Sequence, residues 1–386
     1  MCDGQVDGTG TAGARPSRRA VLGTAAVAGM AAFGAAAAPG RALAAAPARP
    51  DGGRPDARTR LVLLGTAGGP VPIAERFGIS SAVVVGDRTY LFDAGRGSAS
   101  QYVRAGLPLK SLKAVFVTHL HADHTADLFN YLMLAQASPD GDALVPPVRV
   151  FGPGPAGAMG PPFAGPRPVP DVNPDNPTPG LKDLINGSLD ANAYTFNIYG
   201  REGATPIHPE SILELTEIDV SRTGADPLKN RAPRIRPFTV FEDDRIRVQA
   251  TLGAHGLVFP AFGFRCETPD GVITFSGDTA YHENIIELAH GSDVLVHEAV
   301  SVDYYKDKNQ NAAFIEHLKE AHTDVTQVGD VARLAGAGKL VLSHLGPAKP
   351  SMVPDRVWYQ GARRSYRGPV VVGNDLVTVA LRGKRG

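Results

Sequence analysis

Three histidines and one aspartate fall within six consecutive positions of the segment THLHADHT, residues 118–125. The whole chain has eleven histidines, so packing alone does not explain this density. His119 and His121 are two positions apart, and on extended backbone both side chains point to one side, as neighbouring ligands of one metal ion do. Asp123 and His124 follow where the chain is expected to turn into a helix, so they can face a second ion. The spacing therefore predicts a metal site.

Three further ligand-type residues follow short apolar runs much later in the chain: His255, Asp278 and His344. Each comes directly after a small residue, where the backbone can approach a metal ion closely. Polar side chains rarely lie buried without partners, so a shared site explains the whole set better than separate places in the core or on the surface. The sequence thus predicts that these residues complete the metal site.

Short strands delimited by turns are expected to position these residues. Runs of β-branched or apolar residues predict strands at residues 61–64, 82–85, 90–92, 114–117, 148–151, 246–250, 261–266, 272–275, 294–296, 340–342 and 370–372. Apolar residues at helical spacing predict helices at residues 126–136, 284–290, 312–321 and 325–335. This order of elements predicts a layered α/β domain over residues 61–386.

An irregular insertion, residues 152–236, is expected to interrupt this order. Its first part, residues 152–180, has ten Pro and six Gly in 29 positions, so no regular element is expected to run through it. Loops this long in compact domains are usually functional or disordered. The insertion is therefore expected to cover the mouth of the site, to contact the partner subunit of a homodimer, or to act as a tether.

The chain begins with a segment that resembles a twin-arginine export signal. Ser17, Arg18 and Arg19 precede a weakly apolar Ala/Gly-rich run at residues 24–38, and small-x-small cleavage patterns follow at residues 42–46. The run lacks Leu and Ile and is short for a bilayer span, which needs about 20 apolar residues. We expect residues 1–46 to be a removable signal peptide and residues 47–60 a linker. We therefore expect export to the periplasm or the extracellular space, and no stable membrane anchor after cleavage.

The charge balance bears on the substrate. The chain has 39 Lys+Arg and 39 Asp+Glu, and removing residues 1–46 takes away four basic and two acidic residues, which leaves 35 against 37. Phosphate contacts dominate affinity for nucleic acid, and this chain lacks the basic excess for many of them. A nucleic-acid partner is therefore not favoured. Of the two cysteines, Cys2 lies in the leader and Cys266 is left alone, which excludes a disulfide framework.

Six short blocks, together with the histidine segment, resemble the metallo-β-lactamase-fold hydrolases, and within them the ribonuclease Z group and its secreted, arylsulfatase-like relatives. The blocks are LGTAGGP at residues 64–70, FDAGRG at 92–97, FSGDT at 275–279, VLVHEA at 294–299, HT at 322–323 and LSH at 342–344. The resemblance implies a four-layer αββα sandwich with a Pro-rich insertion. It also implies a hydrolase that cleaves phosphodiester or related sulfate or carboxylic esters, in small-molecule or oligomeric substrates.

The resemblance further implies two Zn²⁺ ions, with Mn²⁺ or Fe²⁺ as alternatives. One ion would take His119, His121 and His255, the other Asp123, His124 and His344, and Asp278 would bridge them. Imidazole and carboxylate suit zinc, and two ions about 4 Å apart can share a hydroxide and grip a substrate oxyanion. Asp123 would also orient that nucleophile, and His322 would donate a proton to the leaving group.

Other polar residues are expected to support the ligands. Ligating histidines commonly lean on a carboxylate, so Glu298, His297 and Asp93 are expected around the site. His322 has a competing structural explanation, as an ordinary residue before a helix that Thr323 or Asp324 would cap. The histidines without such context are expected at the surface: His208, His282, His290 and His317.

Three other functions stay open at this stage. The same centre would serve a lactonase or a β-lactamase. A 3′-tRNA-processing endonuclease is the second alternative, although residues 229–236 are the one basic cluster between the early and late motifs, and LGPAK follows His344 in place of that group's Ser/Arg/Tyr pattern. The third is a metal-binding protein without activity.

The leader generates the first testable prediction. A reporter protein fused behind residues 1–46 should be exported, because this segment combines the arginine pair, the weakly apolar run and the cleavage pattern. Fractionation of cells that express the fusion measures the outcome. A reporter that stays in the cytoplasm would contradict the assignment.

Overall fold

The computed structural model describes residues 59–132, 141–163, 165, 169–202 and 209–381. The predicted signal peptide and nearly all of the linker lie outside these residues, as do His208 and the end of the helix predicted at 126–136. Among the described residues, no helix is both long enough and apolar enough to cross a membrane.

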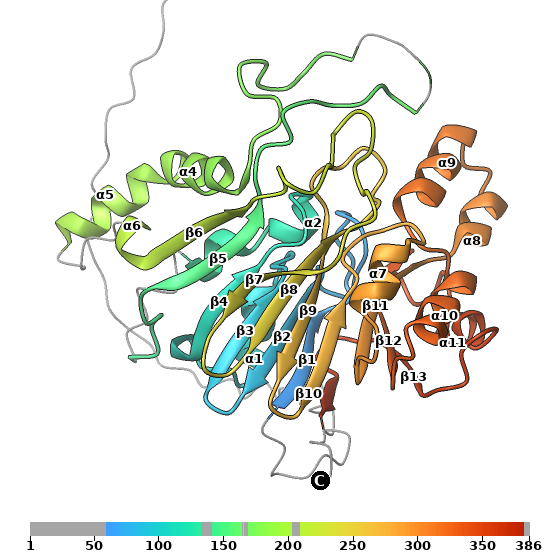
Figure 1. Cartoon of the computed structure of the whole chain (residues 1–386). Coiled ribbons are helices and arrows are strands. Elements are labelled where there is room, and N and C mark those ends of the chain that lie inside the picture. Colours follow the sequence, from blue (N-terminus) through green and yellow to red (C-terminus); the bar gives the residue numbers. More distant parts are fainter. Residues whose placement is uncertain (1–58, 133–140, 164, 166–168, 203–208, 382–386) are drawn as a thin grey trace, which may run out of the picture. The chain divides into compact units, whose positions relative to one another are not determined.

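Two seven-stranded mixed sheets form the body of residues 59–381 (Figure 1). In the order of pairing, the first sheet contains β14 (Thr378–Ala380), β1 (Thr59–Gly65), β2 (Ser80–Val85), β3 (Arg88–Phe92), β4 (Leu112–Phe116), β5 (Val148–Pro153) and β6 (Leu213–Ile218). The second contains β13 (Val370–Val372), β12 (Leu340–Gly346), β11 (Val294–Val300), β10 (Gly271–Phe275), β9 (Phe262–Thr268), β8 (Arg247–Leu252) and β7 (Phe238–Glu242).

Helices cover the outer face of each sheet. Those of the first half are α1 (Ser98–Arg104), α2 (Ala122–Thr125), α3 (Leu128–Leu132), α4 (Leu181–Ala191), α5 (Ala193–Arg201) and α6 (Pro209–Ile212). Those of the second half are α7 (Glu283–Leu288), α8 (Val302–Asp307), α9 (Ala312–Ala321), α10 (Val325–Leu334) and α11 (Asp355–Ala362). In Figure 1, α4 to α6 lie beside β6 on the left, and α7 to α11 lie on the right.

Three buried clusters define the layers. The largest joins the inner faces of both sheets, where Phe92 stacks on Phe116 and Phe275 at ring-centroid distances of 5.0 and 4.1 Å. A second cluster joins the outer face of the first sheet to α1, α3 and α4. The third joins the outer face of the second sheet to α7, α10 and α11. These clusters confirm the predicted four-layer αββα sandwich, because each apolar sheet face is buried against its own partner.

The strand directions bring four loops to one edge of the sandwich. Strand β4 is parallel to β3 and β5, and β10 is parallel to β11, which is parallel to β12. Strand β8 is antiparallel to β9, which is antiparallel to β10, so β8 and β10 run the same way. The carboxyl ends of β8, β10 and β12 therefore meet at one edge of the second sheet. That edge is where His255, Asp278 and His344 follow their strands.

The insertion is partly regular. No regular element was predicted for residues 152–180; strand β5 runs into this part as far as Pro153, and the described residues of 154–180 form no helix or strand. The elements α4, α5, α6 and β6 follow. Strand β6 pairs in parallel with β5 and extends the first sheet. The sequence pattern did not predict these elements because they bury little: α4 buries Leu181 and Ile185, and α5 buries none of its residues.

Candidate metal centre

The histidine segment folds as a turn between β4 and α2. Its backbone is extended as far as His121, which has φ −63° and ψ 146°, and helical from Ala122 onward. Asp123 and His124 are therefore carried by the first turn of α2 and are buried, whereas His121 is exposed. The expected change from strand to helix within this segment is observed, and it turns the two pairs of ligand-type side chains in different directions.

One carboxylate oxygen lies at the middle of the candidate centre. Oδ2 of Asp278 is 3.2 Å from Nε2 of His344 and 3.4 Å from Nε2 of His124. It is also 3.9 Å from Nε2 of His119 and 3.8 Å from Nε2 of His255. Four imidazole nitrogens from three segments of the chain thus surround a single oxygen, which is where a carboxylate shared by two ligand groups would lie.

The structure brings the seven predicted ligands together. His119, His121 and His255 offer nitrogens within 4.8 Å of one another, and Asp123, His124 and His344 form a second such group. Asp278 joins His119 and His124 in a third group, which connects the first two. This division follows the two ligand sets that the family resemblance implies.

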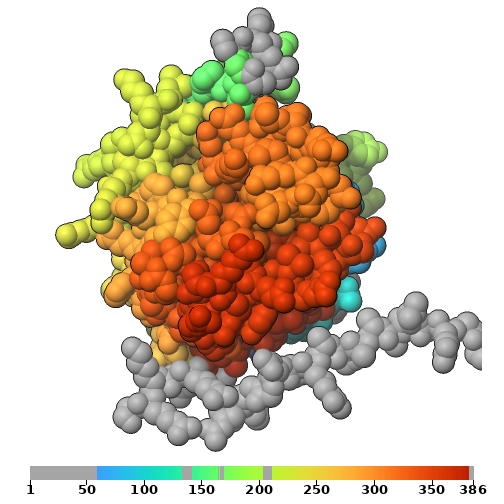
Figure 2. All heavy atoms as spheres, turned by 90° about the vertical axis from the view of Figure 1, so that its right-hand side faces the viewer, coloured from blue at the N-terminus to red at the C-terminus, as the bar shows by residue number. Residues whose placement is uncertain are grey.

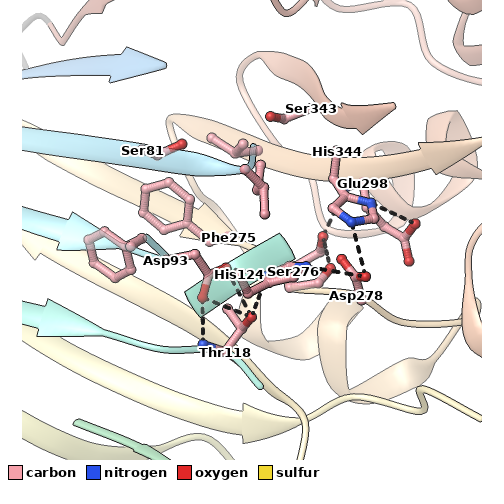
Figure 3. A pocket seen from close by; sticks show the side chains of 14 residues that line it. Ser81, Asp93, Thr118, His124, Phe275, Ser276, Asp278, Glu298, Ser343 and His344 are labelled. Carbon is pink, nitrogen blue, oxygen red and sulfur yellow. Dashed lines mark hydrogen bonds and ion pairs between the residues drawn. The ribbon is translucent and has the colours of Figure 1, made fainter. Parts of the chain in front are cut away.

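The outer atoms of the histidines are fixed by hydrogen bonds. Asp93 accepts hydrogen bonds from Nδ1 of His124, 2.9 Å away, and from the backbone N–H of Thr118, 2.7 Å away. The Thr118 hydroxyl donates to Asp93 over 2.9 Å and lies 3.1 Å from Nδ1 of His119. Figure 3 shows Asp93 between Thr118 and His124. With each Nδ1 engaged, Nε2 is the nitrogen left to face an ion.

His255 and Asp123 are held by main-chain groups. Nδ1 of His255 donates to the carbonyl oxygen of Ala321 over 2.7 Å, and the Gly69 N–H donates to Oδ2 of Asp123 over 2.9 Å. Gly69 has φ +84°, a conformation that favours glycine. The glycine turn of the LGTAGGP block thus holds the carboxylate of Asp123, a candidate ligand, in place.

Unpartnered buried atoms show that these residues fit metal ions. Nε2 of His119, Nε2 of His124 and Oδ1 of Asp278 are buried and have no hydrogen-bond partner among the described residues. Such atoms are costly to leave unpaired, and metal coordination satisfies them. Imidazole nitrogens with carboxylate oxygens are a donor set that suits Zn²⁺.

The protonation preferences of the histidines differ with their surroundings. Burial, together with neighbouring histidines, holds the pKa of His119 and His255 well below the ordinary value. Burial also lowers the pKa of His124 and His344, but the nearby carboxylates together outweigh it and raise both: Asp278 and Asp93 for His124, Asp278 and Asp123 for His344. A metal ion would replace the protons of the latter pair, since histidine binds metal as neutral imidazole.

His322 and Glu298 form a pair beside the ligands. Nδ1 of His322 is 2.9 Å from Oε2 of Glu298 and 3.9 Å from Oδ2 of Asp278. Burial lowers the pKa of His322, but Glu298 and Asp278 more than compensate and raise it to about 9. The helix cap is a separate residue, Asp324, whose side chain accepts from the N–H of Thr326. His322 therefore faces the centre while its neighbour starts α10.

A cavity of about 540 Å³ opens in front of the centre. Its floor contains His121, Asp123, Asp278, His322 and His344, and its walls come from the 68–73 loop, from α8 and α9, and from the residues after β12. This volume is in the range of small-molecule sites. A smaller void of about 30 Å³ lies behind the centre, against Phe92 and Phe275 of the inter-sheet core.

The histidines outside the candidate centre lie in different surroundings. His290 is exposed, as expected, and His282 caps α7 through Nδ1, which accepts from the N–H of Asn284. The expectation of a surface position was wrong for His317, which lines the cavity one helical turn before His322. His297 is buried, and its Nδ1 donates to the carbonyl oxygen of Glu298 instead of to a ligand.

The comparisons with known proteins agree with this geometry. The model of the metallo-beta-lactamase superfamily matches residues 75–306. The chain belongs to the metallo-beta-lactamase superfamily. Its similarity to the ribonuclease Z of Mycobacterium bovis (BCG, Pasteur strain) is 28% identity over 327 residues, which covers 84% of this chain and 99% of that protein.

Solved structures of the superfamily share the fold. Human tRNase Z, short form, superposes with a TM-score of 0.55 at 19% identity and covers 83% of this chain and 99% of its own. Zn²⁺-bound PqqB from Methylobacterium extorquens superposes with a TM-score of 0.52 at 14% identity and covers 83% of this chain and 100% of its own. The αββα sandwich is thus the fold that these solved structures share.

The position of Asp93 generates a prediction about metal affinity. Asp93→Asn keeps a residue that tolerates the observed φ of +59° but removes the charge that orients His124. We expect zinc affinity to fall about 10–100-fold, which is typical when such an outer partner is changed. Competition with a chelator measures it. Asp270→Asn is the matched control, because Asp270 also accepts from a threonine hydroxyl, that of Thr59. Equal affinity in the wild type and Asp93→Asn would contradict the assignment.

Proposed function

We propose that this protein is an exported hydrolase that uses two divalent metal ions, zinc in the first place, to cleave phosphodiester or related ester bonds. Superfamily membership supports hydrolysis, and the leader residues support export. The observation that carries the proposal is the convergence of ligand-type atoms around Oδ2 of Asp278 at the floor of an open cavity.

The ligand residues would hold the two ions in the groups already described. When bound, such ions supply Lewis acidity, which lowers the pKa of water and stabilises negative charge on substrate oxygens. Asp123 lies at the cavity floor, with its Oδ2 3.2 Å from Nε2 of His344. Its carboxylate can accept a hydrogen bond from a water and so orient that water toward the substrate.

His322 is placed to handle the leaving group. It lines the cavity, and its Nδ1 is held by a carboxylate that also accepts from the Thr279 N–H over 2.7 Å. With Nδ1–H donating to Glu298, the ring can carry a second proton on Nε2. General acids of this kind donate a proton to the departing oxygen. Glu298 also lines the cavity, and the role we assign to it is to position His322 through the contact with Nδ1.

The same centre would also support two alternative activities. Cleavage of a tRNA 3′ end is favoured by the similarity to proteins named ribonuclease Z. The charge balance of 39 basic and 39 acidic residues supports a smaller ester instead. Hydrolysis of a lactone or β-lactam is the other candidate, since metal ions held by these residues would polarise a carbonyl as well as a phosphoryl oxygen.

Removal of the bridging carboxylate tests the centre. Purified protein with two equivalents of zinc should hydrolyse bis-p-nitrophenyl phosphate or p-nitrophenyl sulfate, and Asp278→Ala should lose metal and fall to background rate, because it deprives both groups of their shared ligand. Metal analysis and absorbance at the nitrophenol band measure the outcome, with Asp270→Ala as the control.

Other results of these assays would contradict the proposed function or favour one of the alternatives. Silence on both substrates with metal bound would contradict the ester hydrolase. Faster turnover of nitrocefin or of a lactone would select the lactonase or β-lactamase, and faster cleavage of a precursor tRNA would select the nuclease. An Asp278→Ala variant that keeps every measured property would indicate a metal-binding protein without activity.

The His322–Glu298 pair generates a further prediction. His322→Ala should lower kcat about 10²–10⁴-fold, the range for loss of a general acid. Glu298→Gln should lower kcat in the same direction, and the double variant should be little worse than His322→Ala, since the two residues act as a unit. Metal content should stay at two ions per chain in His322→Ala. Loss of an ion from that variant would make His322 a ligand instead.

A further inference from the structure

The loop of residues 66–78 holds the backbone beside the candidate ligand His344. The Leu345 N–H donates to the carbonyl oxygen of Thr66 over 3.0 Å, and the Gly68 N–H donates to the carbonyl oxygen of Leu345 over 3.1 Å. His344 has φ +44°, a conformation that residues other than glycine seldom adopt. Such a conformation persists only where the surroundings enforce it, and both hydrogen bonds fix the residue that follows it.

The same loop holds a second ligand of the same group. The Gly69 N–H donates to Oδ2 of Asp123 over 2.9 Å, and Asp123 shares its ligand group with His124 and His344. The loop forms no hydrogen bond, among the described residues, to the members of the other group: His119, His121 and His255. The loop is therefore tied to one half of the candidate centre.

Apolar packing does little to keep the loop in place. Most of residues 70–75 are exposed, and Val71 is 70% exposed. Ala67 pairs with Gly78 and with Leu345 through isolated bridges only. Segments with few buried apolar contacts open at low cost in free energy. Polar contacts must therefore fix the loop against the ligands.

A buried arginine and an aspartate close the base of the loop. Arg76 is 2% exposed, and its Nη1 donates to the hydroxyl oxygen of Thr66 over 2.7 Å and to the carbonyl oxygen of Gly373. The Thr66 hydroxyl donates in turn to Oδ1 of Asp375 over 2.7 Å, and Oδ2 of Asp375 accepts from the Phe77 N–H over 2.7 Å. The two charged side chains thus join the two ends of the loop, Thr66 and Phe77.

The packing of the core does not explain an arginine at this position. Burial lowers the pKa of Arg76, and the charges of Asp355 and Asp375 oppose this effect. Nη2 of Arg76 lies 3.6 Å from Oδ1 of Asp355, which is 54% exposed at the start of α11, a helix of the red surface in Figure 2. A methionine would fill similar space without burying a charge. The hydrogen bonds across the base of the loop account for the guanidinium.

We infer that Arg76 and Asp375 are positioning residues that preset one half of the metal centre, the group of Asp123, His124 and His344. This inference rests on the proposed function and deepens it, because it says which ion depends on the loop. Breaking the base of the loop releases the backbone beside His344 and the N–H that holds Asp123, so this group loses metal affinity while the other group keeps it. Asp375 and His344 lie outside the residues that the superfamily model matches, 75–306, so membership alone does not imply this network.

The first experiment measures the affinity for each ion. Zinc is titrated by chelator competition into the full chain as the wild type, Arg76→Met and Asp375→Asn. We expect one ion to bind as in the wild type and the affinity for the other to fall about 10–100-fold, the range for loss of a residue that orients a ligand. Arg76→Lys should recover part of this loss, since an ammonium can also donate to the Thr66 hydroxyl.

The matched control is Arg265→Met. The guanidinium of Arg265 also donates to backbone carbonyl oxygens, those of Leu288 and His290, but it lies outside the network of the loop. This variant should lose stability and still bind both ions as the wild type does. A specific effect on one ion in the Arg76 and Asp375 variants is thereby separated from a general loss of stability.

The second experiment needs no metal. Hydrogen exchange of the metal-free full chain should be faster in Arg76→Met and Asp375→Asn than in the wild type, in peptides that cover residues 66–78 and 344–346. Exchange in β8, β9 and β10 should be unchanged, because these strands have no hydrogen bond to the network among the described residues. Should Arg76→Met fail to fold, Asp375→Asn, which keeps the size of the side chain, gives the same test.

The outcomes distinguish this inference from the proposed function. Two ions bound with wild-type affinities in the folded variants, an equal loss of both ions, or unchanged exchange of the loop would each overturn the inference and leave the hydrolase intact. Fewer than two ions in the wild type would contradict the proposed function instead. In that case faster exchange of residues 66–78 and 344–346 would still support the positioning role.

Discussion

The crowding of lone pairs around one carboxylate is the constraint on which this structure depends. Oδ2 of Asp278 has the Nε2 atoms of His344 and His124 at 3.2 and 3.4 Å, and those of His119 and His255 within 4 Å. Neutral imidazole nitrogens and a carboxylate repel one another at such distances unless positive charge lies between them. Protons supply part of that charge, and metal ions supply it with the right valence and coordination number.

The fold overcomes this repulsion by making the ligand segments rigid. Each leaves a strand whose inner face is locked into the inter-sheet core, so the ligands cannot separate without breaking apolar contacts. Glycines then allow the close approach: Gly277, with φ +60°, passes against the carbonyl oxygen of Phe262 just before Asp278, and a Cβ atom on Gly68 would lie 2.8 Å from Nδ1 of His344. Larger residues at either position would push a ligand away from the centre.

The layers and the candidate ligands could be predicted because both depend on short, local patterns of residues in the sequence. Buried strands appear in the sequence as runs of apolar residues, and a candidate ligand such as His255 lies within three residues of the end of its strand. The edge strands β6 and β14 and the surface helices α4 and α5 were not predicted, because they bury few apolar residues that would mark them in the sequence. Thr118 was missed as well, since its contacts with Asp93 and His124 exist only after β3 and β4 have paired.

The reaction and the substrate are therefore specified by different parts of the chain. The centre is built from strand ends that every layer holds in place, so it tolerates little change. Of the cavity-lining rings, Tyr305 and Phe314 pack on a small cluster of three buried residues, whereas Tyr304 packs on the cluster that covers the outer face of the second sheet. Similarity across the whole fold consequently reports on the sandwich and its candidate metal centre, whereas the choice of substrate depends on the residues that line the cavity.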